Sequence, residues 1–417
     1  MTDRNLKAAQ AVDEARLWRR LMRLAEIGAT PAGGVNRQAL SPEDTEAKRL
    51  LAGWAAELGF GVEIDEIGNL YVRRPGLDAN AAPVVTGSHL DSQPTGGKFD
   101  GAYGVIAGFE ALEALEQAGI ETRRALEVVA WTNEEGSRFQ PGCMGSAVYV
   151  GAMEPNALLR VTDAGGTSLA EALDATFAGL ADIRRRQSGG AVAAYVEAHI
   201  EQGPRLEQAG LAIGAVTGIQ GSEWFAIEVI GEEAHAGTTP LRQRKDALKA
   251  ACTIVGALEE LMADDTDTVR FTVGRFEVHP GSPNTVPGRV FFTIDFRHPD
   301  LATIDRLCGR IEGVARANAR GCEVRVTRTR KTDPTHFDPE MVALVSAQAK
   351  ALGLASMEIF SGAGHDAQCM AQVCPAGMIF VPCEGGVSHN EAENATPADL
   401  AKGTRVLAAC LAELAGR

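Results

Sequence analysis

The chain has 417 residues and a mass of 44.0 kDa, a length that predicts two domains or three with a substantial buried core. Its formal net charge is −15 at pH 7, from 55 acidic and 40 basic residues. This balance argues against nucleic acid or an anionic membrane surface as a partner, because both attract basic patches. An anionic small molecule is still compatible with it, since a pocket needs only one well-placed arginine.

The eight cysteines are scattered along the chain without a Cys-x-x-Cys pair, which is typical of reduced thiols in a cytoplasmic protein. The N-terminal region mixes acidic and basic residues and has no apolar segment, so we expect no signal peptide. No stretch approaches the roughly 18 consecutive apolar residues of a membrane-spanning helix.

The first part of the chain alternates predicted helices and strands. Apolar residues at near-helical spacing predict one amphipathic helix over about 6–27, and Ser41, Pro42 and Glu43 form a good helix start. A further helix is expected over about 103–118. Strands are expected at 61–64, 70–72, 84–89, 126–132 and 192–200. This alternation predicts an α/β fold with a mixed or largely parallel sheet.

The pattern changes around Gly210. The sequence then predicts strands within 212–230 and at 269–278, 289–296 and 323–329, and helices at 242–262 and 301–319. After them come a helix at 339–352, a strand at 378–381 and a closing helix at 397–414. We expect an α/β domain made of residues 1–211 and 331–417, with an α+β domain inserted at 212–330.

A histidine and two carboxylates follow the apolar strand at 84–89. Side chains alternate along a strand, so His89 and Asp91 leave on the same face, and one can ligate a metal while the other accepts the second imidazole N–H. Asp100 comes after a glycine-rich turn that can aim its carboxylate back at His89. The plainer alternative is a hydrogen-bonded core histidine and a helix N-cap.

Three further polar clusters also lie at predicted strand ends. Glu134 and Glu135 follow the strand at 126–132, and because adjacent side chains diverge, one can ligate a metal while the other faces a substrate. His199 ends the strand at 192–200, and His389 follows the strand at 378–381 and a glycine turn. An isolated pair of glutamates is far more often a solvated acidic turn than a site, but the position of this pair at a strand exit strengthens the case for a site.

Together these residues form a nitrogen and oxygen ligand set without a thiolate, namely His89, Asp100, Glu135, His199 and His389. Such a set suits zinc, manganese, cobalt or nickel. It has too many members for one tetrahedral ion but fits two ions that share Asp100, an arrangement that activates water at neutral pH. Competing signatures are weak: Gly96-Gly97-Lys98 is no phosphate loop, and Cys143 is better explained as a buried thiol than as a nucleophile.

The set of motifs closely resembles the hydantoinase/carbamoylase group of amidohydrolases, which is related to the M20 metallopeptidases. The resemblance covers nearly the whole chain in order and rests on Gly87–Asp91, Asp100-Gly101, Asn133–Gly136, His199–Gly203, Pro283–Thr285, Arg297 and Ser388-His389. It implies a catalytic domain and an inserted lid domain that also forms a homodimer. It also implies two divalent ions, one held by His89, Asp100 and His199 and the other by Asp100, Glu135 and His389.

The resemblance assigns further roles to individual residues. It makes Glu134 the general base and Asp91 the carboxylate behind His89. It makes His235 the group that stabilises the oxyanion, from the partner subunit. Asn284 and Arg297 would bind a substrate carboxylate, and Gln202 would contact the ureido group. For Arg297 alone, a surface salt bridge is the plainer interpretation.

The resemblance implies hydrolysis of an N-carbamoyl group to an amino acid, carbon dioxide and ammonia. Residues 91–97 look more like hydrolases of N-carbamoyl-L-amino acids or β-ureidopropionate than like allantoate enzymes. Allantoate or ureidoglycolate stays open as a substrate, and an M20-type exopeptidase is disfavoured because peptidase branches often carry an acidic residue where this chain has His199. The alternative of a different class is a metal-free homologue that only binds a carboxylate.

Overall fold

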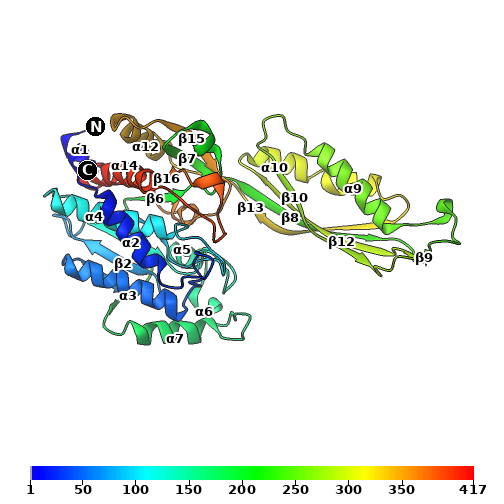
Figure 1. Cartoon of the computed structure of the whole chain (residues 1–417), viewed down its shortest axis with the longest axis horizontal. Helices are drawn as coiled ribbons and strands as arrows, with labels where there is room; N and C mark the ends of the chain where they lie inside the picture. The colour runs from blue at the N-terminus through cyan, green and yellow to red at the C-terminus, as the bar shows by residue number, and fades with distance from the viewer. Residues whose placement is uncertain (1) are drawn as a thin grey trace. The chain divides into compact units, whose positions relative to one another are not determined.

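The computed structural model describes residues 2–417, which form two compact units (Figure 1). The first unit combines the chain up to Thr217 with His336–Arg417, and the second is Gly218–Thr335. The expected boundary after residue 211 lies too early, because the strand at Ile213–Ile219 pairs with the sheet of the first unit. The expected boundary after residue 330 falls inside the strand Glu323–Thr332.

A ten-stranded mixed sheet runs through the first unit. Its strands are β1 (Gly61–Ile64), β2 (Leu70–Arg74), β3 (Val84–His89), β4 (Leu126–Trp131), β5 (Arg184–Arg185), β6 (Ala194–Ile200), β7 (Ile213–Ile219), β14 (Thr335–His336), β15 (Ser356–Ser361) and β16 (Ala376–Val381). Their order is β14-β7-β16-β6-β3-β4-β2-β1-β5, with β15 beside β7. The neighbours β16, β6, β3 and β4 run parallel, whereas β2 is antiparallel to β4, which confirms the expected mixed α/β sheet.

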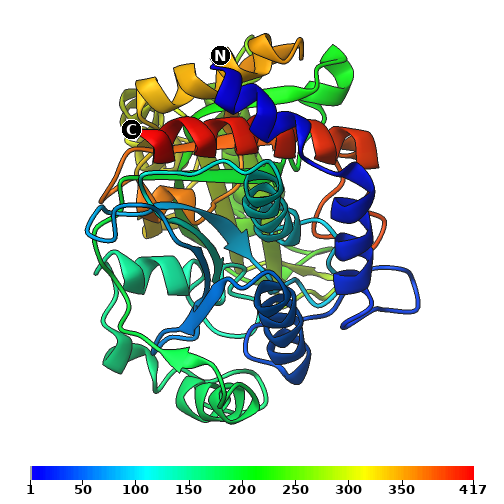
Figure 2. The same ribbon diagram turned by 90° about the vertical axis from the view of Figure 1, so that its left-hand side faces the viewer.

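Helices of the first unit begin where the sequence supplies caps. The Ser41 side chain accepts the N–H of Asp44 at the start of α3, and Thr396 does the same for Asp399 at the start of α14. The helix α14, red in Figure 2, packs beside α1 and α4. The helical segments are α1 (Asp3–Gln10), α2 (Glu14–Ala25), α3 (Pro42–Glu57), α4 (Ala102–Gln117), α5 (Met144–Tyr149), α6 (Pro155–Leu158), α7 (Leu169–Gly179), α8 (Arg205–Ala209), α12 (Pro339–Ala351), α13 (Ala367–Met370), η2 (Glu384–Gly386) and α14 (Pro397–Gly416).

Two of the expected helices are each divided in two. The segment expected as one helix over 6–27 forms α1 and α2, because the Asp13 side chain caps α2 by accepting the N–H of Arg16. The segment expected as one helix over 301–319 forms α10 (Leu301–Cys308) and α11 (Ile311–Ala317). The first of these ends at Gly309, a residue with low helix propensity. Within residues 2–417, no helix has the length and apolar character needed to cross a bilayer.

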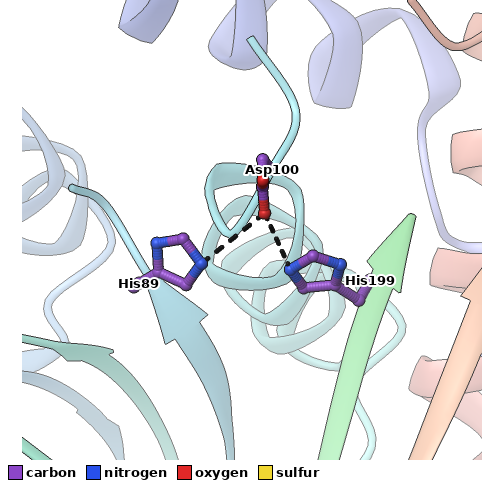
Figure 3. A group of neighbouring side chains, drawn as sticks. All are labelled: His89, Asp100 and His199. Carbon is purple, nitrogen blue, oxygen red and sulfur yellow. Dashed lines mark ion pairs between the residues drawn. The ribbon is translucent and has the colours of Figure 1, made fainter. Parts of the chain in front are cut away.

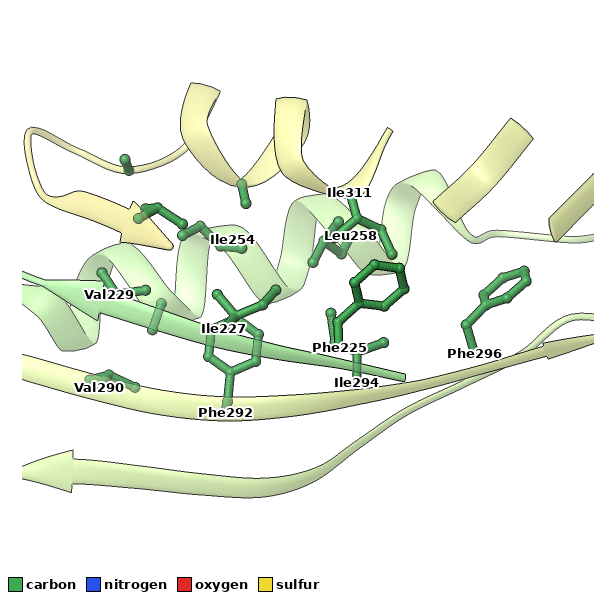
Figure 4. Packing of buried hydrophobic residues seen from close by; sticks show 14 of the residues in the cluster. Phe225, Ile227, Val229, Ile254, Leu258, Val290, Phe292, Ile294, Phe296 and Ile311 are labelled. Carbon is green, nitrogen blue, oxygen red and sulfur yellow. The ribbon is translucent and has the colours of Figure 1, made fainter. Parts of the chain in front are cut away.

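The second unit has a four-stranded antiparallel sheet with helices on one face. The strand order is β10 (Arg270–His279), β12 (Arg289–His298), β8 (Gly221–Ile230) and β13 (Glu323–Thr332). Alternate residues of β8 and β12 are buried and meet α9 (Ala247–Leu261) and α11 (Figure 4). A separate ribbon pairs β9 (Ala234–His235) with β11 (Thr285–Val286), and η1 (Leu241–Gln243) follows it.

Candidate metal centre and active site

The polar residues that follow the strands meet at one edge of the large sheet. The strands β16, β6, β3 and β4 are neighbours and parallel, so their carboxyl ends lie side by side. His89 ends β3, His199 lies near the end of β6, and Glu135 and His389 follow β4 and β16. Sites form at this edge of open α/β sheets because the loops that follow parallel strands converge there.

A buried ligand set lies directly at the ends of β3 and β6. Asp100, in the turn before α4, places Oδ1 at 3.7 Å from His89 Nε2 and 3.3 Å from His199 Nε2 (Figure 3). The three side chains are buried, and one ligand atom from each lies within 4.8 Å of the other two. Donors bonded to one ion at about 2.0–2.2 Å must lie this close together.

The hydrogen bonds at Nδ1 of both imidazoles leave Nε2 to face Asp100, and His199 Nε2 also accepts the N–H of Gly101 at 3.1 Å. His89 Nδ1 lies 2.8 Å from the backbone oxygen of Asp91, and His199 Nδ1 lies 2.9 Å from that of Ile200. A carbonyl oxygen can only accept, so each Nδ1 donates and each neutral ring carries its lone pair on Nε2. Both lone pairs therefore belong to the nitrogens nearest Asp100, as metal ligation requires.

A second ligand set shares Asp100 with the first. Asp100 Oδ2 lies 3.3 Å from His389 Nε2, and Glu135 Oε2 lies 3.2 Å from the same nitrogen. The Gln93 amide donates to Glu135 Oε2 at 2.7 Å and orients that carboxylate. This set is more open than the first, because the His389 side chain is 51% exposed.

The donor set fits two divalent cations. The two oxygens of Asp100 face different ligand sets, which is the geometry of a bridging carboxylate. Burial by itself raises the pKa of Asp100, but hydrogen bonds from the protonated imidazoles of His199 and His389 hold that pKa well below its usual value, so Asp100 is ionised. A bound cation would take the place of those imidazole protons, since ligating histidines are neutral. The close packing continues at Gly101, where a Cβ would lie 2.3 Å from the His89 ring. The N-cap of α4 is Gly101. Asp100 is thus not the helix N-cap that the sequence offered as the plainer alternative to a ligand.

A third group of buried donors lies next to the first set and is held in other bonds. Glu197 accepts from the Ser88 hydroxyl at 2.7 Å and from the N–H of Ala367 at 3.0 Å. His365 Nε2 lies 2.8 Å from the Ser361 hydroxyl. We interpret this group as a polar network that supports the strand ends.

Glu134 also contacts the buried ligand set. Its Oε2 lies 3.5 Å from His89 Nε2, and its Oε1 accepts the Cys143 thiol at 3.3 Å. Burial, together with the negative charges of Asp366 and Glu135, raises the pKa of Glu134 well above its usual value. Burial and the Glu134 charge also raise the pKa of Cys143 well above its usual value, so the thiol keeps its proton and is a poor nucleophile.

Asp91 contacts the site differently from the sequence expectation. Its backbone oxygen, not its carboxylate, lies nearest His89 Nδ1, and the carboxylate oxygen is 3.8 Å from that nitrogen. The carboxylate instead accepts the N–H of Glu134 with Oδ1 and the N–H of Glu135 with Oδ2, each at 3.2 Å. Asp91 is the second residue after β3, and there the chain directs its carbonyl toward the imidazole and its side chain toward the turn after β4.

Gln202, expected from the sequence to contact the ureido group, lies beside the ligand set that contains His389. Its amide donates to Asp100 Oδ2 at 2.9 Å and to the Ser388 hydroxyl at 3.0 Å. Its Oε1 atom is buried and has no hydrogen-bond partner among the described residues. The carboxylate of Asp100 attracts the amide because a charged acceptor makes the stronger hydrogen bond.

His235 and Asn284 come together in the second unit. The ribbon of β9 and β11 carries them, and the N–H of Ala236 donates to the backbone oxygen of Asn284 at 2.9 Å. The N–H groups of Gly237 and Thr238 donate to His235 Nδ1 at 3.1 and 3.2 Å. An Nδ1 atom that accepts carries no hydrogen, so the neutral, exposed imidazole presents its N–H at Nε2.

Arg297 lies toward the other end of the same unit. Its guanidinium contacts the Asp295 carboxylate through Nη2 at 2.8 Å and Nε at 3.1 Å. The ribbon with Asn284 lies beyond the start of β12, whereas Arg297 is next to its last residue (Figure 1). A strand of 10 residues spans about 33 Å, so Asn284 and Arg297 of one chain cannot bind the same small carboxylate.

Several residues that organise the site carried little signal in the sequence. Gln93 and Ser388 lie in or beside the recognised motifs, but nothing in their spacing marks them as partners of Glu135 and Asp100. Glu393 accepts the N–H of Asp100 at 3.1 Å although it is far from it in sequence, and no sequence pattern points to that contact.

Comparison with known proteins agrees with this geometry. The peptidase family M20/M25/M40 matches residues 85–413. An N-carbamoyl-L-amino acid amidohydrolase of Geobacillus stearothermophilus is 42% identical over 400 residues, which are 94% of this chain and 96% of that protein. The allantoate amidohydrolase of Escherichia coli is 36% identical over 410 residues, covering 97% of this chain and 98% of that one.

A solved structure, an amidase of the hydantoinase/carbamoylase family from Burkholderia multivorans, superposes with a TM-score of 0.92. It is 45% identical, and the match covers 97% of this chain and 98% of that one. Similarity of this extent includes both units of the chain. The chain therefore belongs to the M20/M25/M40 peptidase family and, within it, to the hydantoinase/carbamoylase group.

Proposed function

We propose that the protein hydrolyses the N-carbamoyl C–N bond of N-carbamoyl-L-amino acids and releases the amino acid, carbon dioxide and ammonia. The observation that carries the proposal is the Asp100 carboxylate, whose two oxygens face two separate ligand sets. The N-carbamoyl-L-amino acid amidohydrolase with 42% identity favours this substrate class. Two divalent ions, zinc, manganese, cobalt or nickel, suit the nitrogen and oxygen donors.

Bound divalent cations would activate water at neutral pH and polarise the ureido carbonyl oxygen. Glu134 then accepts a proton from the attacking water at Oε2, the carboxylate oxygen nearest His89. The same oxygen returns the proton to the leaving nitrogen as the C–N bond breaks. Burial of Glu134 suits this exchange, because a raised pKa brings a carboxylate closer to the pH at which it works.

The substrate contacts of the second unit support action across a homodimer. Arg297 and the pair of His235 and Asn284 lie toward opposite ends of β12, so one substrate that uses all three needs them from two chains. His235 presents an N–H at Nε2, which suits an oxyanion. A substrate carboxylate would share the guanidinium of Arg297 with Asp295.

The second unit also offers a place for such a dimer. The strand β10 lies at one edge of the four-stranded sheet, where its outer N–H and C=O groups can pair with another strand. We propose a lid and dimerisation role for this unit. We also propose a cytoplasmic location, and the eight free cysteines in the described structure support it.

The test is release of ammonia from a panel of N-carbamoyl-L-amino acids, N-carbamoyl-β-alanine, allantoate and ureidoglycolate. The protein is first stripped of metal and then supplied with manganese, cobalt or zinc. We expect turnover of N-carbamoyl-L-amino acids that depends on added metal. If only allantoate or only N-carbamoyl-β-alanine were turned over, that compound would be the substrate instead of an N-carbamoyl-L-amino acid. Absence of metal binding would refute the mechanism.

A further inference from the structure

A buried glutamate connects the loops that carry Asp100 and His389. Glu393 is 3% exposed, and its Oε1 accepts the N–H of Phe99 at 2.9 Å and the N–H of Asp100 at 3.1 Å. Its Oε2 lies 3.0 Å from the hydroxyl of Ser388, the residue before His389. The Glu393 carboxylate thus contacts the backbone of Asp100 and the side chain of Ser388, which precedes His389.

The Ser388 hydroxyl lies between the carboxylates of Glu393 and Asp100, and its single proton can be donated to one of them at a time. It lies 3.1 Å from Asp100 Oδ2, the same oxygen that faces His389 Nε2 at 3.3 Å. The backbone N–H of Asp100 is therefore bound by Glu393, and its carboxylate accepts the Gln202 amide and lies next to the Ser388 hydroxyl. The contacts of Gln202 and Ser388 are to Oδ2, the oxygen that belongs to the more open ligand set.

The surroundings leave Glu393 little freedom to move. A Cβ at Gly97 would lie 2.1 Å from the Glu393 carboxyl carbon, so the loop before Asp100 passes directly against this group. His389 has a φ of 52°, a left-handed conformation that few residues other than glycine adopt. A strained backbone of this kind persists only where the surrounding structure determines it, and the Ser388 hydroxyl contacts Glu393 directly before His389.

The two ligand sets differ in how firmly they can hold an ion. The set of His89, Asp100 and His199 has two imidazoles and is buried, whereas the other has one imidazole with a half-exposed side chain. Imidazole nitrogen binds zinc and cobalt well, and burial slows exchange with solvent. We therefore expect the set of Asp100, Glu135 and His389 to hold its ion less tightly, because it offers one imidazole where the other set offers two.

We propose that Glu393, acting through Ser388, is a positioning residue for the set of Asp100, Glu135 and His389, and that it determines the affinity for the more weakly held ion. This inference rests on the two-ion site of the proposed function. It assigns Glu393 no contact with substrate.

The test is titration of the metal-free protein with Co²⁺ alone. Binding is measured by the d–d absorption of the bound ion and by equilibrium dialysis. We expect Glu393→Ala and Ser388→Ala each to lower the affinity for the second equivalent of Co²⁺ about 10-fold or more. This is the range for residues that orient metal ligands. The first equivalent stays unchanged within about threefold, which simple loss of folding would not produce. The double variant should bind the second equivalent of Co²⁺ with the same affinity as the single variant that binds it less tightly, because the two residues act as one unit.

Glu391→Ala is the matched control. Glu391 lies on the same loop but binds the Thr30 hydroxyl, so its removal leaves both equivalents as in the unmodified protein. If Glu393→Ala does not fold, Ser388→Ala alone decides the matter. The inference would be overturned if Ser388→Ala bound both equivalents of Co²⁺ as tightly as the unmodified protein does. The proposed function would be overturned if the unmodified protein bound no Co²⁺.

Discussion

The Asp91 carboxylate holds the backbone of Glu134 in place, with Oδ1 accepting its N–H at 3.2 Å. The second oxygen of Asp91 does the same for Glu135 at 3.2 Å. The loop after β3 thereby fixes the turn after β4, and the two adjacent glutamates are directed to separate tasks. Glu134 faces His89, and Glu135 faces His389.

Asp91→Asn should therefore disturb the turn that carries Glu134 while leaving the set of His89, Asp100 and His199 in place, because Asp91 reaches His89 through its backbone oxygen. An amide has one acceptor oxygen, so one of the two backbone N–H groups would face an NH₂ group. We expect kcat to fall about 10–100-fold, as for partners that orient functional groups. Steady-state kinetics and metal content measured on the same preparations would check this.

Asp182→Asn is a suitable control for that variant, because Asp182 pairs with Arg49 at an exposed surface. Its kinetics should match those of the unmodified protein. Loss of metal together with loss of activity in Asp91→Asn would contradict a role for Asp91 in orienting the general base.

Glu134→Gln removes the proton acceptor while keeping the size of the side chain. We expect kcat to fall about 10²–10⁴-fold, the usual contribution of a general base, with both equivalents of metal retained. Rapid-quench or steady-state ammonia release measures the rate, and Glu57→Gln at the exposed end of α3 serves as the control. More than about a tenth of the original activity in Glu134→Gln would mean that another group moves the proton.

Gly101→Ala should destroy the buried ligand set. Gly101 has a φ of 64°, and an added Cβ would lie 2.3 Å from the His89 ring, so the imidazole has to move. We expect loss of metal binding and activity, with a destabilisation of about 1–3 kcal/mol from the strained backbone. Metal analysis and thermal unfolding measure the two effects.

Gly53→Ala provides the opposite case within the same chain. Gly53 lies in α3, and a Cβ there would meet nothing within 4 Å. We expect it to stabilise the protein by about 0.5–1 kcal/mol without changing metal content, because alanine has the higher helix propensity. A similar response from both glycine variants would show that crowding at His89 is not the cause.

Mixing two inactive variants tests whether His235 acts across the dimer. His235→Ala and Arg297→Ala should each lose most activity as pure proteins. If one site takes Arg297 from its own chain and His235 from the partner, a mixed dimer has one intact site. Random mixing of a two-fold dimer then restores roughly a quarter of the original activity.

The mixture is prepared by dissociating and reassociating the two purified variants, and its activity is compared with that of either variant treated alone. No recovery, in a sample shown by mass spectrometry to contain mixed dimers, would place His235 and Arg297 of one chain at one site. Monomeric protein with full activity would refute the dimer itself.

The sequence determined the elements and the kinds of ligand because both depend on neighbouring residues. Ser41 caps a helix, the apolar run at 84–89 forms β3, and each is decided by local propensity and hydrophobic periodicity. Polar residues at the ends of strands are also visible in one dimension. For that reason His89, His199 and the other candidate ligands could be proposed before any distance was known.

Only the tertiary structure decided which atoms face one another. Each oxygen of Asp100 faces its own ligand set, the Asp91 carboxylate contacts a neighbouring turn and not His89, and Gln202 binds Asp100. Glu393 contacts Asp100 across 293 positions of sequence. Such contacts depend on how loops from different strands pack together. The strength of a hydrogen bond changes when the donor–acceptor distance changes by tenths of an ångström, and the spacing of residues along the sequence does not determine that distance.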